Sequence, residues 1–286
     1  MSALADDFED GHRFFESKDY ARALASYRKA ALQGQAPAQF ELGLMYRRGQ
    51  GVAQNFKLAA FWLERAATQG HGPAQFNLGV MHAEGQGVMQ DYAQAASWFE
   101  KAALQEYAAA QFNLGVMYTE GRGVMQDFTR ALSWYEKATA QGYAPAQFNL
   151  GQMYYNGQGV AQDRKRAAVL YEQAAMQGSA EAQFNLGVLY YNGHGVAQDY
   201  ERALHWYERA VAQENALAQV SLGVMYYNGQ GVAQDFTEAH KWFSLAAANG
   251  NHTATRNRET VEKKMTREQI AEAQRRVRAW IKAPRK

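Results

Sequence analysis

The chain has 286 residues, a formal net charge of +2 and no cysteine. Apolar residues make up 47% and charged residues 20%, a composition that argues against wholesale disorder. The lack of cysteine excludes disulfides, thiolate nucleophiles, iron–sulfur clusters and cysteine-type zinc sites. The N-terminal residues lack the basic and apolar stretches of a secretion signal, and no apolar run approaches about 18 residues. We therefore expect a cytoplasmic protein without a membrane span.

Charge is distributed unevenly along the chain. Residues 1–250 carry 19 basic and 24 acidic side chains, whereas residues 251–286 carry 11 and 4. A negatively charged body is a poor surface for nucleic acid, because affinity for phosphates comes mainly from Lys and Arg. A nucleic-acid-binding hypothesis therefore rests on the basic tail alone, which a solubilising end explains more simply.

A period of 36 residues organises the chain from residue 36 to residue 251. In each copy a Leu-Gly pair is followed by Gly-x-Gly-Val, and an Asn or Asp able to cap a helix comes shortly afterwards. Each copy thus predicts two helices with a glycine loop between them. The Leu-Gly pairs are Leu42-Gly43, Leu78-Gly79, Leu114-Gly115, Leu150-Gly151, Leu186-Gly187 and Leu222-Gly223, and the caps are Asn55, Asp91, Asp127, Asp163, Asp199 and Asp235.

The second helix of each copy carries an apolar stripe too wide for one partner helix to cover. In the first copy this stripe consists of Ala59, Trp62, Leu63, Ala66 and Ala67. Neighbouring copies must bury it, so stacked copies share one continuous core. The predicted fold class is all-α, a right-handed α-α superhelix, or solenoid, of helix-turn-helix repeats.

The recurring pattern Ala38, Leu42-Gly43, Tyr46, Gly49, Asn55, Ala59 and Trp62 resembles the Sel-one-like repeat, a branch of the tetratricopeptide-type hairpins. The resemblance implies a tetratricopeptide-like N-terminal capping hairpin at 1–35. The apolar stripe of Ile270, Ala273, Val277 and Trp280 predicts a basic C-terminal capping helix at 252–286. Thr266 and Gln269 have the spacing of a capping box at the start of that helix, and Pro284 stops it. Between the caps lie six repeats, at 36–71, 72–107, 108–143, 144–179, 180–215 and 216–251.

The resemblance also implies a function: a non-catalytic scaffold or adaptor that binds a partner protein or peptide in the concave groove lined by the first helices. Bacterial signalling regulators and toxin-neutralising immunity proteins that act by occlusion belong to the same interaction class. Two rows of residues face that groove in the predicted arrangement, and packing between repeats is the alternative explanation for them. The aromatic row is Phe40, Phe76, Phe112, Phe148 and Phe184, and the amide row is Asn77, Asn113, Asn149 and Asn185.

The copies differ most at the end of the first helix, where specificity for a partner is expected. The residues there run from basic through acidic to tyrosine-rich, and tyrosine is favoured at interfaces because it combines a large rigid ring with a polar tip. The predicted contacts are Arg47, Arg48, Glu84, Glu120, Tyr155, Tyr191 and Tyr227.

Catalytic alternatives find little support in the sequence. The Gly-x-Gly motifs lack the features of a phosphate-binding loop, and no histidines have the spacing of metal ligands. Glu84 and Glu120 lie one period apart, and a separation of about 8 to 10 Å would suit an inverting glycosidase. A solvated face explains them more simply. We expect a monomer with no catalytic residues, cofactor or metal, and with another protein or peptide as its partner.

Overall fold

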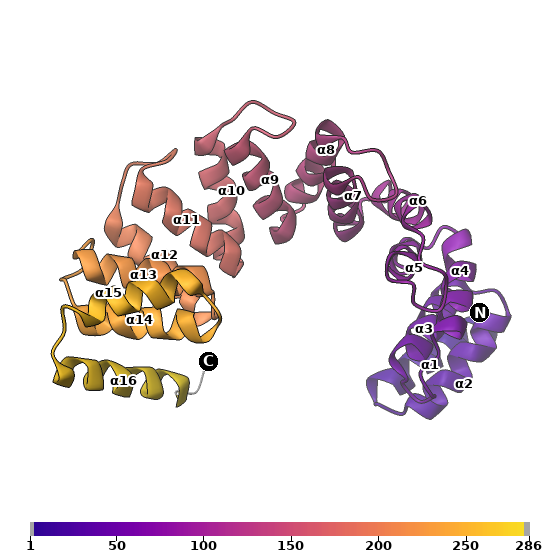
Figure 1. The fold of residues 1–286 in the computed structure, drawn as a ribbon. Helices are drawn as coiled ribbons and strands as arrows, with labels where there is room; N and C mark the ends of the chain where they lie inside the picture. Colours follow the sequence, from indigo (N-terminus) through magenta and orange to yellow (C-terminus); the bar gives the residue numbers. More distant parts are fainter. Residues whose placement is uncertain (1–2, 283–286) are drawn as a thin grey trace. The chain divides into compact units, whose positions relative to one another are not determined.

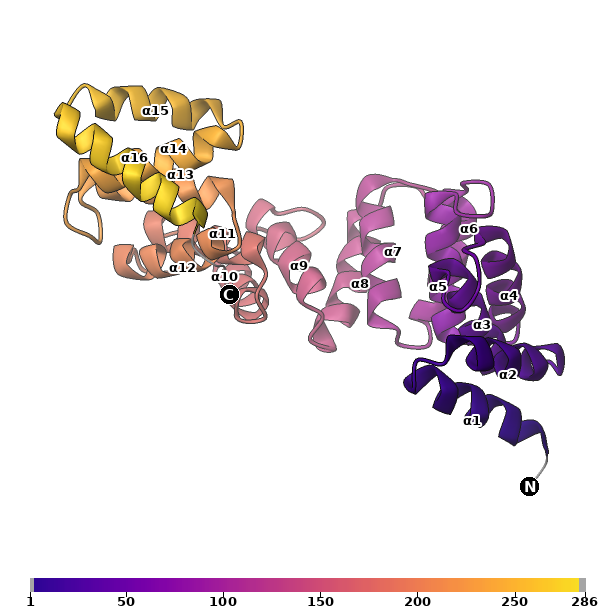
Figure 2. The same cartoon turned by 90° about the horizontal axis from the view of Figure 1, so that it is seen from below.

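The computed structural model describes residues 3–282, which form sixteen α-helices and no strand (Figure 1 and Figure 2). The chain divides into two compact units, 1–143 and 144–286. The first contains α1 (Ala3–Glu16), α2 (Tyr20–Leu32), α3 (Ala36–Arg48), α4 (Phe56–Thr68), α5 (Gly72–Glu84), α6 (Tyr92–Ala103), α7 (Ala108–Glu120) and α8 (Phe128–Ala140). The second contains α9 (Ala144–Asn156), α10 (Arg164–Met176), α11 (Ala180–Asn192), α12 (Tyr200–Ala212), α13 (Ala216–Asn228), α14 (Phe236–Ala248), α15 (His252–Glu262) and α16 (Arg267–Lys282).

Helical hairpins stack within each unit, which confirms the predicted all-α solenoid class. We call the first helix of each hairpin the A helix and the second the B helix. The glycine of each Leu-Gly pair lets the two helices approach closely. A Cβ atom added at Gly79 would lie only 2.7 Å from the ring of Phe99, which is 3% exposed. The hairpin therefore closes around a large B-helix side chain that only glycine leaves room for.

Both glycines of the Gly-x-Gly loop after α3 have positive φ angles, which favour glycine. Gly49 ends α3 in the left-handed conformation, with φ of 69°. Gly51 has φ of 70°, and a Cβ atom there would lie 2.5 Å from the carbonyl oxygen of Tyr20 in the preceding hairpin. The predicted N-caps are also present, since Asn55 Oδ1 accepts from the amide of Leu58 at 3.0 Å. The loops thus turn the chain and dock each copy on its predecessor.

A ladder of buried glutamines joins consecutive hairpins, a feature that the sequence analysis did not anticipate. Gln75 donates its side-chain amide to the carbonyl of Ala67 in the preceding B helix at 3.0 Å. Its side-chain oxygen accepts from Gln105, the second residue after the end of α6, at 2.8 Å. C-cap glutamines of other B helices make the same bond to Gln39, Gln111, Gln147 and Gln183. Gln39, Gln75, Gln111 and Gln183 each add a second hydrogen bond to a carbonyl that already accepts the backbone amide three residues later.

The chain after residue 251 forms two helices, α15 and α16, where the sequence indicated a single capping helix. α15 begins 36 residues after α13 and buries Ala254 at the position of Ala218. It is thus the A helix of a degenerate further copy. The expected glycine is replaced by Glu259, which leaves no room for close packing on α15, and α16 packs instead on α14. Residues 283–286, including Pro284, lie outside the described residues.

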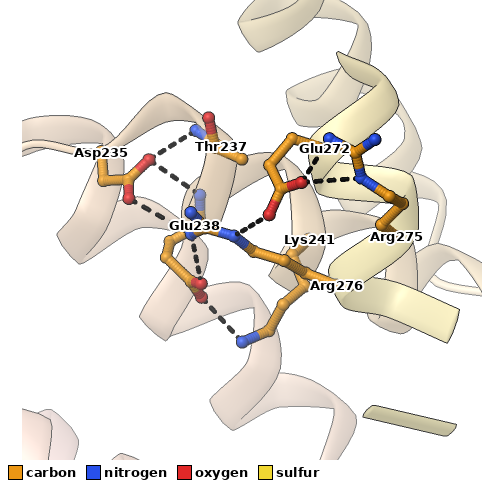
Figure 3. A network of polar contacts seen from close by, with 7 residues as sticks. All are labelled: Asp235, Thr237, Glu238, Lys241, Glu272, Arg275 and Arg276. Atoms are coloured by element: carbon orange, nitrogen blue, oxygen red, sulfur yellow. Dashed lines mark hydrogen bonds and ion pairs between the residues drawn. The ribbon is translucent and has the colours of Figure 1, made fainter. Parts of the chain in front are cut away.

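Ionic contacts (Figure 3) and one aromatic contact attach α16 to α14. Arg276 reaches Glu238 at 2.6 Å and Asp235 at 3.4 Å, and Glu272 of α16 holds the same guanidinium at 3.1 Å. The rings of Trp242 and Trp280 meet edge to face with centroids 4.9 Å apart.

The predicted capping box begins α16. The amide of Thr266 donates to Gln269 Oε1 at 2.8 Å, and the amide of Gln269 donates back to Thr266 Oγ1 at 3.3 Å. The start of this helix is therefore set by its own residues, while its position is set by the contacts with α14.

Candidate functional site

Three similar pockets lie between consecutive A helices, one in the first unit and two in the second. They lie between α5 and α7, between α9 and α11, and between α13 and α15, and each has a volume of about 220 Å³. Seven lining positions are shared and are separated by two repeat periods. Those positions are Val80, Ala83, Glu84, Phe99, Asn113, Val116 and Met117; then Gln152, Tyr155, Asn156, Tyr171, Asn185, Val188 and Leu189; then Val224, Tyr227, Asn228, Phe243, Asn257, Thr260 and Val261.

The pocket of the first unit has a charged rim. Glu84 and Glu120 both line it, as does Arg122, which pairs with Glu120 at 2.9 Å. Arg47 lies 3.9 Å from Glu84 and donates to the side chain of Asn77 at 3.0 Å. The predicted basic and acidic stretches are therefore in direct contact with each other.

Arg48 lies beside a buried carboxyl group at the start of the amide row. Glu41 occupies the position of the later asparagines and is partly buried. Burial raises the pKa of the Glu41 carboxyl above its ordinary value, and the neighbouring His12 and Arg48 oppose that effect. The row thus begins with a titratable group and continues with neutral amides.

The three predicted tyrosines of the second unit are partly buried, and Tyr155 and Tyr191 make polar contacts with the next hairpin. Tyr155 Oη lies 3.4 Å from Nδ1 of His194, and Tyr191 donates to Gln230 Oε1 at 2.7 Å. Both partners are the middle residue of a Gly-x-Gly loop. Tyr227 packs against Phe236, and Lys264 Nζ lies 4.5 Å from its ring centre. Tyr155 and Tyr227 line pockets in rigid orientations, which lowers the entropy cost of contact with a ligand.

The phenylalanine row is used largely for packing between copies. Phe76 lies between Phe99 of its own B helix, at a centroid distance of 5.7 Å, and Tyr107 at the start of the next A helix, at 5.0 Å. The other members of the row also contact aromatic rings. Phe40 contacts His71, Phe112 contacts both Tyr135 and Tyr143, Phe148 contacts Tyr171, and Phe184 contacts Tyr207.

The asparagine row includes pocket walls. Asn113 and Asn185 each line one pocket, whereas Asn77 bonds to its own helix at Pro73 and to Arg47. Asn149 is partly buried and also has an interaction partner. Asn257, which lines the third pocket, is not among the asparagines predicted from the sequence. Counting the period onward from Ala218 and Ser221 to Ala254 and Asn257 would have revealed it.

Two further properties concern the described part of the chain. No cluster of three or more His, Cys, Asp or Glu residues suited to a metal ion occurs among residues 3–282. Within the same range, none of the helices combines the length and the apolar character needed to cross a bilayer.

Comparison with known proteins places these pockets in a family context. The family model of the Sel1 repeat matches seven consecutive segments, 1–35, 36–71, 72–107, 108–143, 144–179, 180–215 and 216–251. A solved Sel1 repeat protein from Oxalobacter formigenes is 32% identical, with 84% of this chain and 96% of that chain covered and a TM-score of 0.75.

Two more distant likenesses accompany these. The structure of c5321, a protective antigen of uropathogenic Escherichia coli displaying an SLR fold, is 27% identical over 97% of this chain and 84% of its own, with a TM-score of 0.61. The HRD3 component of an ERAD-associated E3 ubiquitin-protein ligase from Candida glabrata is 43% identical over 49 residues. That match spans 17% of this chain and 6% of the yeast protein.

Proposed function

The chain belongs to the Sel1 repeat family, whose members generally mediate protein–protein interaction on a non-catalytic scaffold fold, and from this premise we infer its function. We propose that it is itself a non-catalytic scaffold that binds an extended segment of a partner protein along its A helices. The supporting observation is that one pocket design recurs three times at a fixed period with an asparagine on its wall.

The pockets suit a peptide because they combine an apolar floor with amide groups. Phe99 and Met117 form part of the floor in the first unit, and Tyr171 and Leu189 do so in the second. Such a floor takes an apolar side chain of the partner. The adjacent asparagine offers both a donor and an acceptor, which can satisfy a peptide N–H and C=O irrespective of the partner's sequence.

The rims supply selectivity in this proposal. In the first unit, Glu84, Glu120 and Arg122 form a charged rim that selects polar or charged partner residues. In the second unit, Tyr155 and Tyr227 present neutral aromatic surface, which favours apolar and aromatic residues. The first unit therefore selects partner residues by charge, and the second unit selects them by shape.

Quantitative affinity capture from the native lysate tests the proposal. Replacing Tyr155, Tyr191 and Tyr227 together by Ala should reduce recovery of the main partner at least about tenfold. The matched control replaces Leu104, Met176 and Leu217 by Ala, because these apolar side chains are exposed and line none of the three pockets. Equal recovery by wild type and the tyrosine variant, with unchanged circular dichroism, would contradict the proposal.

A second triple variant addresses the hydrogen bonds. Replacing Asn113, Asn185 and Asn257 by Ala removes one wall amide from each pocket and leaves the apolar floors intact. Affinity for a synthetic peptide of the captured partner should fall, and methylating the peptide backbone nitrogens should produce a similar loss. Full affinity after both changes would exclude backbone recognition.

The non-catalytic assignment is tested separately with a panel of hydrolase substrates. Turnover by wild type that is lost in Glu84→Gln would overturn it.

A further inference from the structure

A fourth pocket, unlike the three above, lies between α14, α15 and α16 at the end of the second unit and is open to solvent. Its volume is about 400 Å³, within the range of small-molecule sites. Apart from Val277, its lining residues all carry polar groups: His240, Ser244, Arg258, Glu262, Gln274 and Arg278.

The other copies provide an internal reference for this pocket. His240 stands where earlier B helices have only Ala or Leu, namely Leu24, Ala60, Ala96, Leu132, Ala168 and Leu204. Arg258 stands where the six earlier copies have the buried leucine of the Leu-Gly pair, and Glu262 replaces an aromatic Tyr or His. Ser244 replaces a glutamate that five copies share, Glu64, Glu100, Glu136, Glu172 and Glu208.

A need for solubility at the end of the solenoid does not explain these replacements. A capping repeat requires polar side chains that face solvent. His240 is instead 2% exposed, and the side chain of Arg258 is two thirds covered, with an exposed fraction of 34%. Burying polar groups at positions that are apolar elsewhere costs stability unless hydrogen bonds or a ligand compensate for it.

Hydrogen bonds within the pocket use some of these groups and leave others available. His240 Nε2 lies 2.8 Å from Glu262 Oε1, and its Nδ1 lies 3.3 Å from Ser244 Oγ. Arg258 Nε is 3.6 Å from Glu262, beyond hydrogen-bonding distance, and is buried without a hydrogen-bond partner among the described residues. The pocket therefore contains two positively charged guanidinium groups, from Arg258 and Arg278, and one carboxylate, from Glu262. That carboxylate is already bonded to His240.

We propose that this pocket binds a small organic anion through a carboxylate or phosphate group. Arg258 and Arg278 supply charge and N–H donors, and Gln274 and Ser244 supply neutral donors. The replacement of glutamate by Ser244 removes a second carboxylate and opens space for the ligand. Glu262 positions His240 and does not contact the anion. The site is separate from the peptide-binding pockets, so it stands whether or not the proposed function holds.

Isothermal titration calorimetry of the full chain with inorganic phosphate, and separately with succinate, tests the proposal. Saturable binding is expected for at least one probe, and the probe that binds distinguishes a phosphate site from a carboxylate site. Ser244→Glu restores the residue of the other copies and should weaken binding at least tenfold. Glu208→Ser makes the reverse change in the preceding copy and should leave binding unchanged. Arg278→Gln, on the exposed face of α16, should also weaken binding and covers the case in which Ser244→Glu fails to fold.

The outcomes that overturn the proposal are specific. Absence of saturation by both probes up to about 10 mM would leave no site of useful affinity. Equal binding by wild type, Ser244→Glu and Arg278→Gln would place the anion elsewhere on the basic surface. Ligand-induced shifts of the His240 ring resonances, assigned with the variant His240→Leu, should accompany binding in wild type and disappear in Arg278→Gln.

Discussion

The pocket between α5 and α7 and the pocket between α9 and α11 have the same framework and different rims. Both floors consist of a B-helix aromatic ring and an A-helix apolar residue, in equivalent positions. The rim residues Ala83 and Glu84 of the first unit correspond to Tyr155 and Asn156 of the second. The periodic residues thus determine the framework of each pocket, and a few non-periodic residues determine its chemistry.

The strongest test of the shared framework removes a core leucine from each unit. Leu114 and Leu186 are 2% and 1% exposed at equivalent positions. Leu114→Ala and Leu186→Ala should each lower the free energy of unfolding by about 3 kcal/mol, because both leave a cavity in the same surroundings. Urea denaturation measures the loss, with the exposed Leu104→Ala as a control expected within about 0.5 kcal/mol of wild type. Very different losses in the two units would contradict a common framework.

The glutamine ladder sharpens the comparison between internal copies and the end of the second unit. Gln183 both donates to Ala175 and accepts from Gln213, whereas Gln219 Oε1 has no partner among residues 3–282. Gln183→Leu should cost about 2 kcal/mol because it removes two hydrogen bonds, each worth about 1 kcal/mol. Gln219→Leu should cost clearly less in the same denaturation experiment. Equal losses would show that the ladder contributes nothing beyond side-chain volume.

The rims should differ in how their contribution to partner binding responds to salt. The double variant Glu84→Gln and Glu120→Gln should lower affinity at low ionic strength and have little effect at high ionic strength, because salt screens exposed charges. The double variant Tyr155→Ala and Tyr227→Ala should lower affinity about tenfold at both. Dissociation constants measured at two salt concentrations distinguish the variants. A salt-independent effect of the glutamates would contradict recognition by charge.

The smallest expected effect concerns the attachment of α16. Hydrogen bonds from Arg275 and Arg276 hold the pKa of Glu272 below its ordinary value. Because the pKa of Glu272 is lower in the folded than in the unfolded state, its stabilisation is complete above the unfolded-state pKa of about 4.3. It is lost as the pH falls through the lower folded-state value.

Thermal unfolding over this acidic range tests the assignment. Glu272→Gln should have a smaller pH-dependent loss of unfolding temperature than wild type, and the difference should be modest because the carboxylate is exposed to solvent. Identical pH profiles for the two proteins would remove Glu272 from the attachment of α16.

Most of the fold could be predicted because its determinants repeat at a fixed spacing. Three kinds of determinant are visible in the sequence itself. They are the N-cap residues such as Asn55, the glycines such as Gly49 that end helices, and the glycines such as Gly79 at which two helices approach closely. The glutamine ladder was missed because a polar residue on a helix is usually exposed, and nothing local shows that Gln75 faces a carbonyl of the preceding copy. α15, the first helix after residue 251, was missed because Arg258 and Glu259 replace the Leu-Gly pair.

The candidate site was less predictable than the fold. The sequence placed Asn113, Asn185 and Tyr155 on the A helices, and these residues do line pockets. It could not separate Phe76, which is enclosed by two aromatic rings, from residues that face open space. That distinction depends on side-chain packing across copies. The boundaries of the caps at 1–35 and 252–286 remain a proposal, since truncation experiments are what test them.

The glutamine ladder also bears on how proteins of this type change in length. Gln75 and Gln111 each bond to a carbonyl eight positions earlier and to a glutamine thirty positions later. Deleting or duplicating 36 residues preserves these spacings, so each ladder glutamine meets an equivalent carbonyl and an equivalent glutamine. Inserting or deleting a single residue at the same junction changes both spacings and breaks both hydrogen bonds. Gain and loss of entire modules is therefore the tolerated route of divergence, and recombination between copies becomes a source of new partner specificities.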